Sequence, residues 1–109
     1  MDFKTYQKKA RLTAQYPNIG SNYIYPTLGL VGEAGEVAEK VKKVIRDKKG
    51  IFDEESKKGI KKELGDVLWY LSNICTEFDF KLEDVALQNL EKLRLRALNG
   101  KISGSGDNR

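Results

Sequence analysis

Apolar residues recur at intervals of three or four along most of the chain, which is the period of an amphipathic helix. No stretch alternates between apolar and polar residues for long enough to predict a sheet. The pattern therefore predicts an all-α, four-helix-bundle-like fold. We expect the helices to span approximately Asp2–Gln15, Thr27–Asp47, Asp53–Phe78 and Leu82–Leu98.

Capping and breaking residues mark the ends of these helices. Asp2 and Asp53 stand where an N-cap is needed, and Lys48-Lys49-Gly50 and Asn99-Gly100 follow predicted helix ends. The sequence therefore predicts one helical domain over residues 1–98. Residues 99–109 are rich in glycine and serine, and we expect them to form a flexible tail.

The composition is that of an ordinary globular domain of 109 residues, with 39% hydrophobic and 33% charged residues. No apolar run approaches the ~20 residues that a membrane span needs. The N-terminal residues Met1-Asp2-Phe3-Lys4 contain no apolar signal segment, and the single Cys75 has no partner for an internal disulfide. We therefore expect a cytoplasmic protein without a membrane partner.

The absence of histidine excludes more chemistry than any other count. It removes Ser-His and Cys-His nucleophiles, imidazole acid–base catalysis and histidine-containing metal sites. Carboxylates, lysine, arginine, tyrosine and hard metal ions remain. The net charge of +4 is compatible with phosphate-bearing ligands but specifies none.

Two carboxylate pairs lie on adjacent predicted helices, Glu33 with Glu36 and Glu63 with Asp66. The spacing of three residues places each pair on one helix face, at the edge of the apolar stripe. An antiparallel hairpin that pivots at Lys49-Gly50 would set Glu33 opposite Asp66 and Glu36 opposite Glu63. The sequence therefore predicts that four carboxylates converge.

Four converging carboxylates repel one another unless a cation joins them. Oxygen ligands without imidazole or thiolate suit Mg²⁺, with Mn²⁺ as a possible substitute. Each pair alone is typical of a solvated helix face, so the metal interpretation depends on their common register. We interpret the mid-helix glycines as sites where backbones or ligands approach closely: Gly29, Gly32, Gly35 and Gly65.

Residues Tyr25–Lys40 and Lys62–Leu71 resemble the MazG-like all-α nucleoside triphosphate pyrophosphohydrolases. That family carries a Glu-x-x-Glu helix followed by a Glu-x-x-Asp helix. The resemblance implies that Glu33, Glu36, Glu63 and Asp66 bind Mg²⁺ and act in catalysis. It also implies hydrolysis of a nucleoside triphosphate, canonical or altered, to its monophosphate and pyrophosphate, in a homodimer or homotetramer. Removal of non-canonical nucleotides is one role that such an activity would serve.

Further residues are candidates for substrate binding. The segment 89–96 is similar to the family's third motif, in which Asn89, Lys92 and Arg96 would contact substrate. Lys40 and Tyr70 continue the acidic faces of their helices and are placed to contact phosphate or sugar. The tyrosines before the second helix are candidates for stacking on a base, although packing is their commoner role: Tyr16, Tyr23 and Tyr25.

Two questions stay open at this point. The sequence does not decide which carboxylate accepts a proton from the attacking water, with Glu33 and Glu36 as candidates. A second class of function is a non-enzymatic basic helical module that binds nucleic acid or a protein partner. For assembly, Trp69 lies far from the apolar centre of its helix, so we expect a single chain to expose it and a second subunit to cover it.

Overall fold

The computed structural model describes residues 1–100 and 104–107, and these residues contain four helices and no strand. This confirms the all-α prediction. The helices are α1 (Phe3–Leu12), α2 (Ile24–Asp47), α3 (Glu54–Glu77) and α4 (Leu82–Leu98). Part of the predicted flexible tail, residues 101–103 and 108–109, lies outside the described residues.

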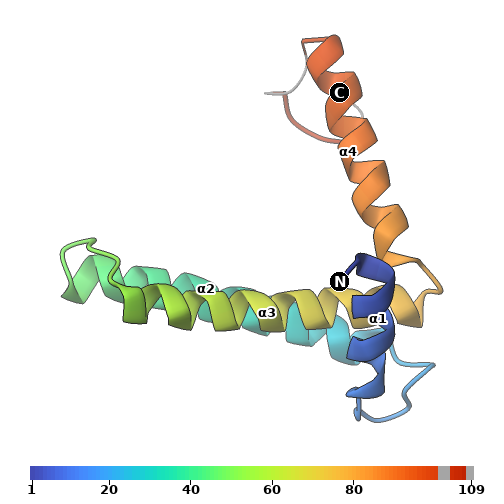
Figure 1. The fold of residues 1–109 in the computed structure, drawn as a ribbon, viewed down its shortest axis with the longest axis horizontal. Coiled ribbons are helices and arrows are strands. Elements are labelled where there is room, and N and C mark those ends of the chain that lie inside the picture. Colours follow the sequence, from blue (N-terminus) through green and yellow to red (C-terminus); the bar gives the residue numbers. More distant parts are fainter. Residues whose placement is uncertain (101–103, 108–109) are drawn as a thin grey trace.

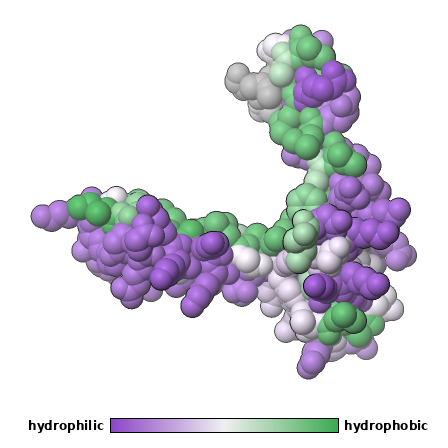
Figure 2. Space-filling view, viewed as in Figure 1, coloured by the Kyte–Doolittle hydropathy of each residue, from purple (hydrophilic) through white to green (hydrophobic). Residues whose placement is uncertain are grey.

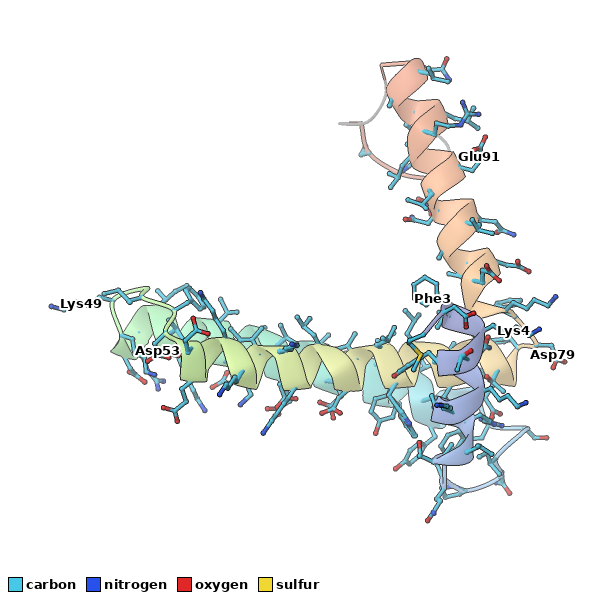
Figure 3. All side chains as sticks on the ribbon, in the orientation of Figure 1. Phe3, Lys4, Lys49, Asp53, Asp79 and Glu91 are labelled. Carbon is cyan, nitrogen blue, oxygen red and sulfur yellow. The ribbon has the colours of Figure 1, made fainter. Side chains whose placement is uncertain are left out.

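The long helices α2 and α3 form an antiparallel hairpin (Figure 1). The connecting turn contains two consecutive left-handed residues, Lys49 with φ 55° and Gly50 with φ 75°. Figure 3 shows Lys49 at the tip of this turn and Asp53 at the start of α3. The Asp53 carboxylate accepts a hydrogen bond from the Ser56 backbone N–H at 2.8 Å, so it is the predicted N-cap.

Helix α2 begins earlier than the sequence pattern indicated, at Ile24 instead of Thr27. Pro26 therefore lies inside the first turn, where its missing N–H has no helical acceptor to lose. The Asn22 side-chain oxygen accepts from the backbone N–H of Tyr25 at 3.0 Å, which satisfies one of the donors at this helix end. These two features allow α2 to begin two residues before the proline.

Helix α1 packs against α3 and covers part of it. The Trp69 indole N–H donates to Thr13 Oγ1 at 2.8 Å, and the ring meets Tyr70 edge to face with centroids 5.0 Å apart. Trp69 is half-buried. The expectation that a single chain exposes Trp69 was wrong, because the end of α1 lies beside this part of α3.

Helix α4 projects away from the hairpin, so one chain forms an elbow and does not close a four-helix bundle (Figure 1). The chain turns at Asp79, with φ 57°, and α4 packs mainly against α1 near Phe3 (Figure 3). Figure 2 shows apolar surface along the inner side of the elbow. Helix α4 exposes most of its large apolar side chains: Val85, Leu87, Leu90, Leu93, Leu95 and Leu98. None of the described helices is long and apolar enough to cross a membrane.

The helix glycines differ in what surrounds them. A Cβ at Gly29 would overlap the Tyr70 ring, so this glycine allows α2 and α3 to approach closely. A Cβ at Gly32, Gly35 or Gly65 would meet nothing within 4 Å. Close packing within the chain therefore explains Gly29 and does not explain the other three, for which the approach of a ligand stays a prediction.

Replacing Gly29 by alanine should displace the Tyr70 ring and lower the thermal unfolding midpoint. The matched control, Gly32→Ala, should raise the free energy of unfolding by about 0.5–1 kcal/mol, because alanine restricts the unfolded chain and has open space in the helix. Thermal denaturation followed by circular dichroism measures both. Equal stabilisation by the two substitutions would contradict the proposed contact between Gly29 and Tyr70.

Candidate metal centre

Three carboxylates meet between the long helices. Glu33 comes from α2 and Glu63 and Asp66 come from α3, and each offers an oxygen atom within 4.8 Å of the other two. We call these residues the acidic trio. The proximity of Gly29 to Tyr70 and of Gly59 to Lys40 fits a register that pivots at residues 49 and 50. The hairpin therefore has the predicted register, which accounts for the trio.

Glu36 is the fourth carboxylate of the predicted cluster, and it lies outside the trio. It is exposed, one helical turn from Glu33 on α2. Its charge still acts on Glu33, since it is among the causes that raise the pKa of that group. The structure thus brings three of the four carboxylates together and leaves Glu36 at the edge of the cluster.

The acidic trio has the electrostatics of a cation site. Partial burial raises the pKa of Glu33, and a hydrogen bond with Glu63 and the nearby charges of Asp66, Glu63 and Glu36 raise it further. One cationic group stands near the trio, Lys40, whose Nζ lies 3.8 Å from a Glu63 oxygen. A cation between these groups would offset their mutual repulsion. A donor set that consists of carboxylate oxygens fits Mg²⁺ or Mn²⁺.

Tyr70 lies beside the trio, as its position on α3 predicted. Burial raises the pKa of Tyr70, and the groups of Tyr25, Glu33 and Asp66 add to this effect. The phenol therefore stays protonated at neutral pH and can donate a hydrogen bond to a ligand oxygen.

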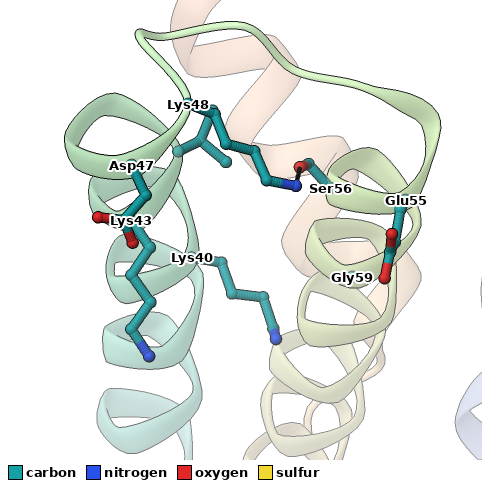
Figure 4. Close-up of a pocket in the computed structure, with 8 residues that line it drawn as sticks. Lys40, Lys43, Asp47, Lys48, Glu55, Ser56 and Gly59 are labelled. Atoms are coloured by element: carbon teal, nitrogen blue, oxygen red, sulfur yellow. Dashed lines mark hydrogen bonds between the residues drawn. The ribbon is translucent and has the colours of Figure 1, made fainter.

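Lys40 also lines a shallow cavity of about 240 Å³ between α2 and α3, close to the hairpin turn (Figure 4). The neighbouring lysines there have acidic partners: Lys43 Nζ lies 3.7 Å from Glu39, and Lys48 Nζ lies 3.2 Å from Asp53. Lys40 alone connects this cavity with the acidic trio. The cavity therefore borders the acidic trio through Lys40.

The three candidates on α4 are not brought to the acidic trio within one chain (Figure 1). Asn89 is exposed, and Arg96 is buried. Lys92 and Arg96 both bind the carboxylate of Asp107, at 3.0 and 3.2 Å. A role for these residues in the site therefore requires a second chain or a movement of α4.

Sequence reasoning missed a buried polar cluster around Glu77, near the C-terminal end of α3. Its carboxylate binds Arg11 and Tyr16 and two backbone N–H groups of the segment between α1 and α2. No local spacing indicates this cluster, because its members lie more than 50 positions from Glu77. A charged residue on the apolar side of α3 is the only signal that the sequence offers.

Comparison with known proteins identifies the class. A family model described as the MazG nucleotide pyrophosphohydrolase domain matches residues 25–99, so the chain belongs to this family. The Gene 37 protein of Mycobacterium phage L5 is 46% identical over 114 aligned positions that cover all of both chains. No solved structure gives a significant match.

The raised pKa of Glu33 gives a prediction about pH. Between the usual value of 4.5 and the higher folded value, the folded state binds more protons than the unfolded state. In metal-free buffer the free energy of unfolding should therefore fall as pH rises through this window. Glu33→Gln should make this fall shallower and weaken the stabilisation by Mg²⁺.

Chemical denaturation at several pH values, with and without Mg²⁺, measures this effect. The control is Glu54→Gln, a matched change on the exposed first turn of α3. An identical pH profile for wild type and Glu33→Gln would refute the electrostatic coupling within the trio.

Proposed function

We propose that the chain is a Mg²⁺-dependent nucleoside triphosphate pyrophosphohydrolase that converts a ribo- or deoxyribonucleoside triphosphate to its monophosphate and pyrophosphate. The observation that carries this proposal is the acidic trio, in which oxygens of Glu33, Glu63 and Asp66 lie within 4.8 Å of one another. Membership of the MazG family supports the reaction class.

The acidic trio would hold Mg²⁺, or Mn²⁺ in its place, with Glu36 beside it. The bound ion supplies positive charge that offsets the triphosphate and favours ionisation of the attacking water. In the reaction, the water oxygen forms a bond to the α-phosphorus, and the bond from this phosphorus to the bridging α–β oxygen breaks. Pyrophosphate leaves with that oxygen. Of the two candidates for the general base, we favour Glu36, which is exposed at the edge of the cluster and would accept the proton from water.

Two further side chains would bind the substrate from the same hairpin. The Lys40 ammonium group lies beside Glu63 and can donate to a phosphate oxygen when substrate is present. The protonated Tyr70 hydroxyl can donate to a phosphate or to the sugar. The open space next to Gly32, Gly35 and Gly65 leaves room for a ligand near the carboxylates.

We further propose that the active form is a homo-oligomer, a dimer or a tetramer. The exposed leucines of α4 and the apolar inner side of the elbow (Figure 2) are surfaces that a second copy of the chain would cover. In such an assembly Asn89, Lys92 and Arg96 would contact substrate at a site whose acidic trio belongs to another subunit.

The catalytic proposal is tested by Glu36→Gln and Asp66→Asn. Each change keeps the side-chain shape and removes a negative charge, so each should lower Mg²⁺-dependent pyrophosphate release by about 100-fold or more and leave the helical content intact. Glu39→Gln is the matched control, since Glu39 pairs with Lys42 on α2 away from the trio.

Near-wild-type release from both variants at saturating nucleotide would contradict the role of the carboxylates. If no canonical or modified nucleotide releases pyrophosphate, and oligonucleotides bind with strong salt dependence, the basic interaction module is the correct function.

Assembly is tested by Leu90→Glu, which places a charge on the exposed apolar side of α4. Sedimentation should show a smaller species than wild type, with reduced nucleotide turnover, because burying an unpaired carboxylate is costly. Gln88→Glu adds the same charge at an exposed polar position and should leave the oligomer unchanged. A wild type that is already monomeric at micromolar concentration would disprove the assembly.

A further inference from the structure

Glu77 has an unusually complete set of hydrogen bonds for a carboxylate in a small domain. Its side chain is 1% exposed. One oxygen accepts from Arg11 at 2.6 Å, from the Tyr16 hydroxyl at 2.7 Å and from the Gly20 N–H at 3.0 Å. The other oxygen accepts from the Asn22 N–H at 2.7 Å. This one carboxylate therefore binds α1 and both ends of the segment that leads to α2.

The Glu77 side chain is ionised at neutral pH. Burial alone would raise the pKa of Glu77, but the hydrogen bonds from Asn22, Tyr16, Gly20 and Arg11 together lower it to about 2. The group is thus an anion at neutral pH, the form that accepts hydrogen bonds from all four donors.

Two connections lead from Glu77 to Tyr25, at the start of α2. In the first, Asn22 donates its backbone N–H to Glu77 and accepts the Tyr25 N–H with its side chain. In the second, Tyr16 donates its hydroxyl to Glu77, and its ring stacks on the Tyr25 ring with centroids 5.0 Å apart and an interplanar angle of 15°. Both the backbone and the ring of Tyr25 are therefore fixed through Glu77.

Of the three tyrosines that the sequence suggested for base stacking, Tyr25 lies inside the first turn of α2, and its position suits a ligand at the acidic trio. It is 45% exposed, and on α2 it lies one helical turn before Gly29, where an added Cβ would overlap the Tyr70 ring, with Glu33 one turn further on. Tyr25 also adds to the raised pKa of Tyr70. Tyr16 is only 6% exposed, so its ring is not available for stacking on a base. Tyr23 is 53% exposed, but its ring packs on Phe78, with centroids 5.2 Å apart, at the C-cap of α3 and about two helical turns beyond Tyr70.

We propose that Glu77 is a positioning residue that holds Tyr25 at the edge of the acidic trio, where the tyrosine ring contacts the sugar or base of the bound nucleotide. This inference rests on the proposed function. A substrate whose phosphates lie at the trio must place its nucleoside beyond them, and Tyr25 is an exposed aromatic group next to Tyr70. Loss of one stacking contact should weaken nucleotide binding by about tenfold.

The test compares a ligand that has a nucleoside with one that lacks it. KM and kcat are measured for the four common deoxynucleoside triphosphates, and inorganic tripolyphosphate is measured as a competitive inhibitor. Tyr25→Ala and Glu77→Gln should raise KM for the preferred nucleotide about tenfold and leave both kcat and the inhibition constant of tripolyphosphate within about threefold of wild type. Tyr23→Ala is the control from the same segment and should change neither the nucleotide KM nor the inhibition constant of tripolyphosphate.

Asn22 provides a second test, because Glu77→Gln leaves Arg11 without a charged partner and can unfold the chain. Asn22→Ala keeps the backbone bond to Glu77 and removes both side-chain bonds of Asn22, to the Tyr25 N–H and to the Pro17 carbonyl, and should raise the nucleotide KM. Asn22→Ser restores an oxygen acceptor at this helix end and should recover most of the increase in KM.

The single tryptophan, Trp69, packs against Tyr70, so its fluorescence reports tripolyphosphate binding independently of turnover.

The outcomes separate the two proposals. If wild type releases pyrophosphate and the Tyr25→Ala and Asn22→Ala variants keep its nucleotide KM, the positioning role is overturned and the proposed function stands. Equal weakening of nucleotide and tripolyphosphate binding would also overturn it, because that result indicates general damage to the site. If wild type neither hydrolyses the nucleotides nor binds tripolyphosphate, the proposed function itself fails.

Discussion

The antiparallel register of α2 and α3 is the constraint on which the rest of this molecule depends. Each helix contributes carboxylates at a spacing that places them on one face, and only the facing register converts these faces into a site. The left-handed turn at Lys49 and Gly50 sets this register. A slip by one residue would rotate the facing positions by about 100° and separate Glu33 from Glu63 and Asp66.

The register also has an energetic consequence. Three acidic groups within 4.8 Å of one another oppose folding when all are ionised. Burial and a hydrogen bond with Glu63 raise the pKa of Glu33, and this repulsion raises it further. The chain balances part of it with Lys40, whose Nζ lies 3.8 Å from a Glu63 oxygen. A divalent cation would turn the same repulsion into binding energy, which is why the arrangement points to metal-dependent chemistry.

Much of this arrangement could be predicted from the sequence, because it depends on local spacing. The helices, the caps at Asp2 and Asp53 and the register of the hairpin all follow from residues close in the chain. The coverage of Trp69 by α1, the direction of α4 and the cluster around Glu77 depend on contacts between distant segments. Helical periodicity carries no information about such contacts, so it could not place Asn89, Lys92 and Arg96 relative to the acidic trio.

The central claim is that the acidic trio holds a divalent cation, and anomalous X-ray scattering from crystals grown with Mn²⁺ tests it most directly. The account predicts an anomalous difference peak within about 2.0–2.6 Å of carboxylate oxygens from Glu33, Glu63 and Asp66. The peak should disappear in crystals of Asp66→Asn. A Mn²⁺ peak bound elsewhere on the chain, with ordered carboxylates at the trio and none of them in contact with metal, would contradict the claim.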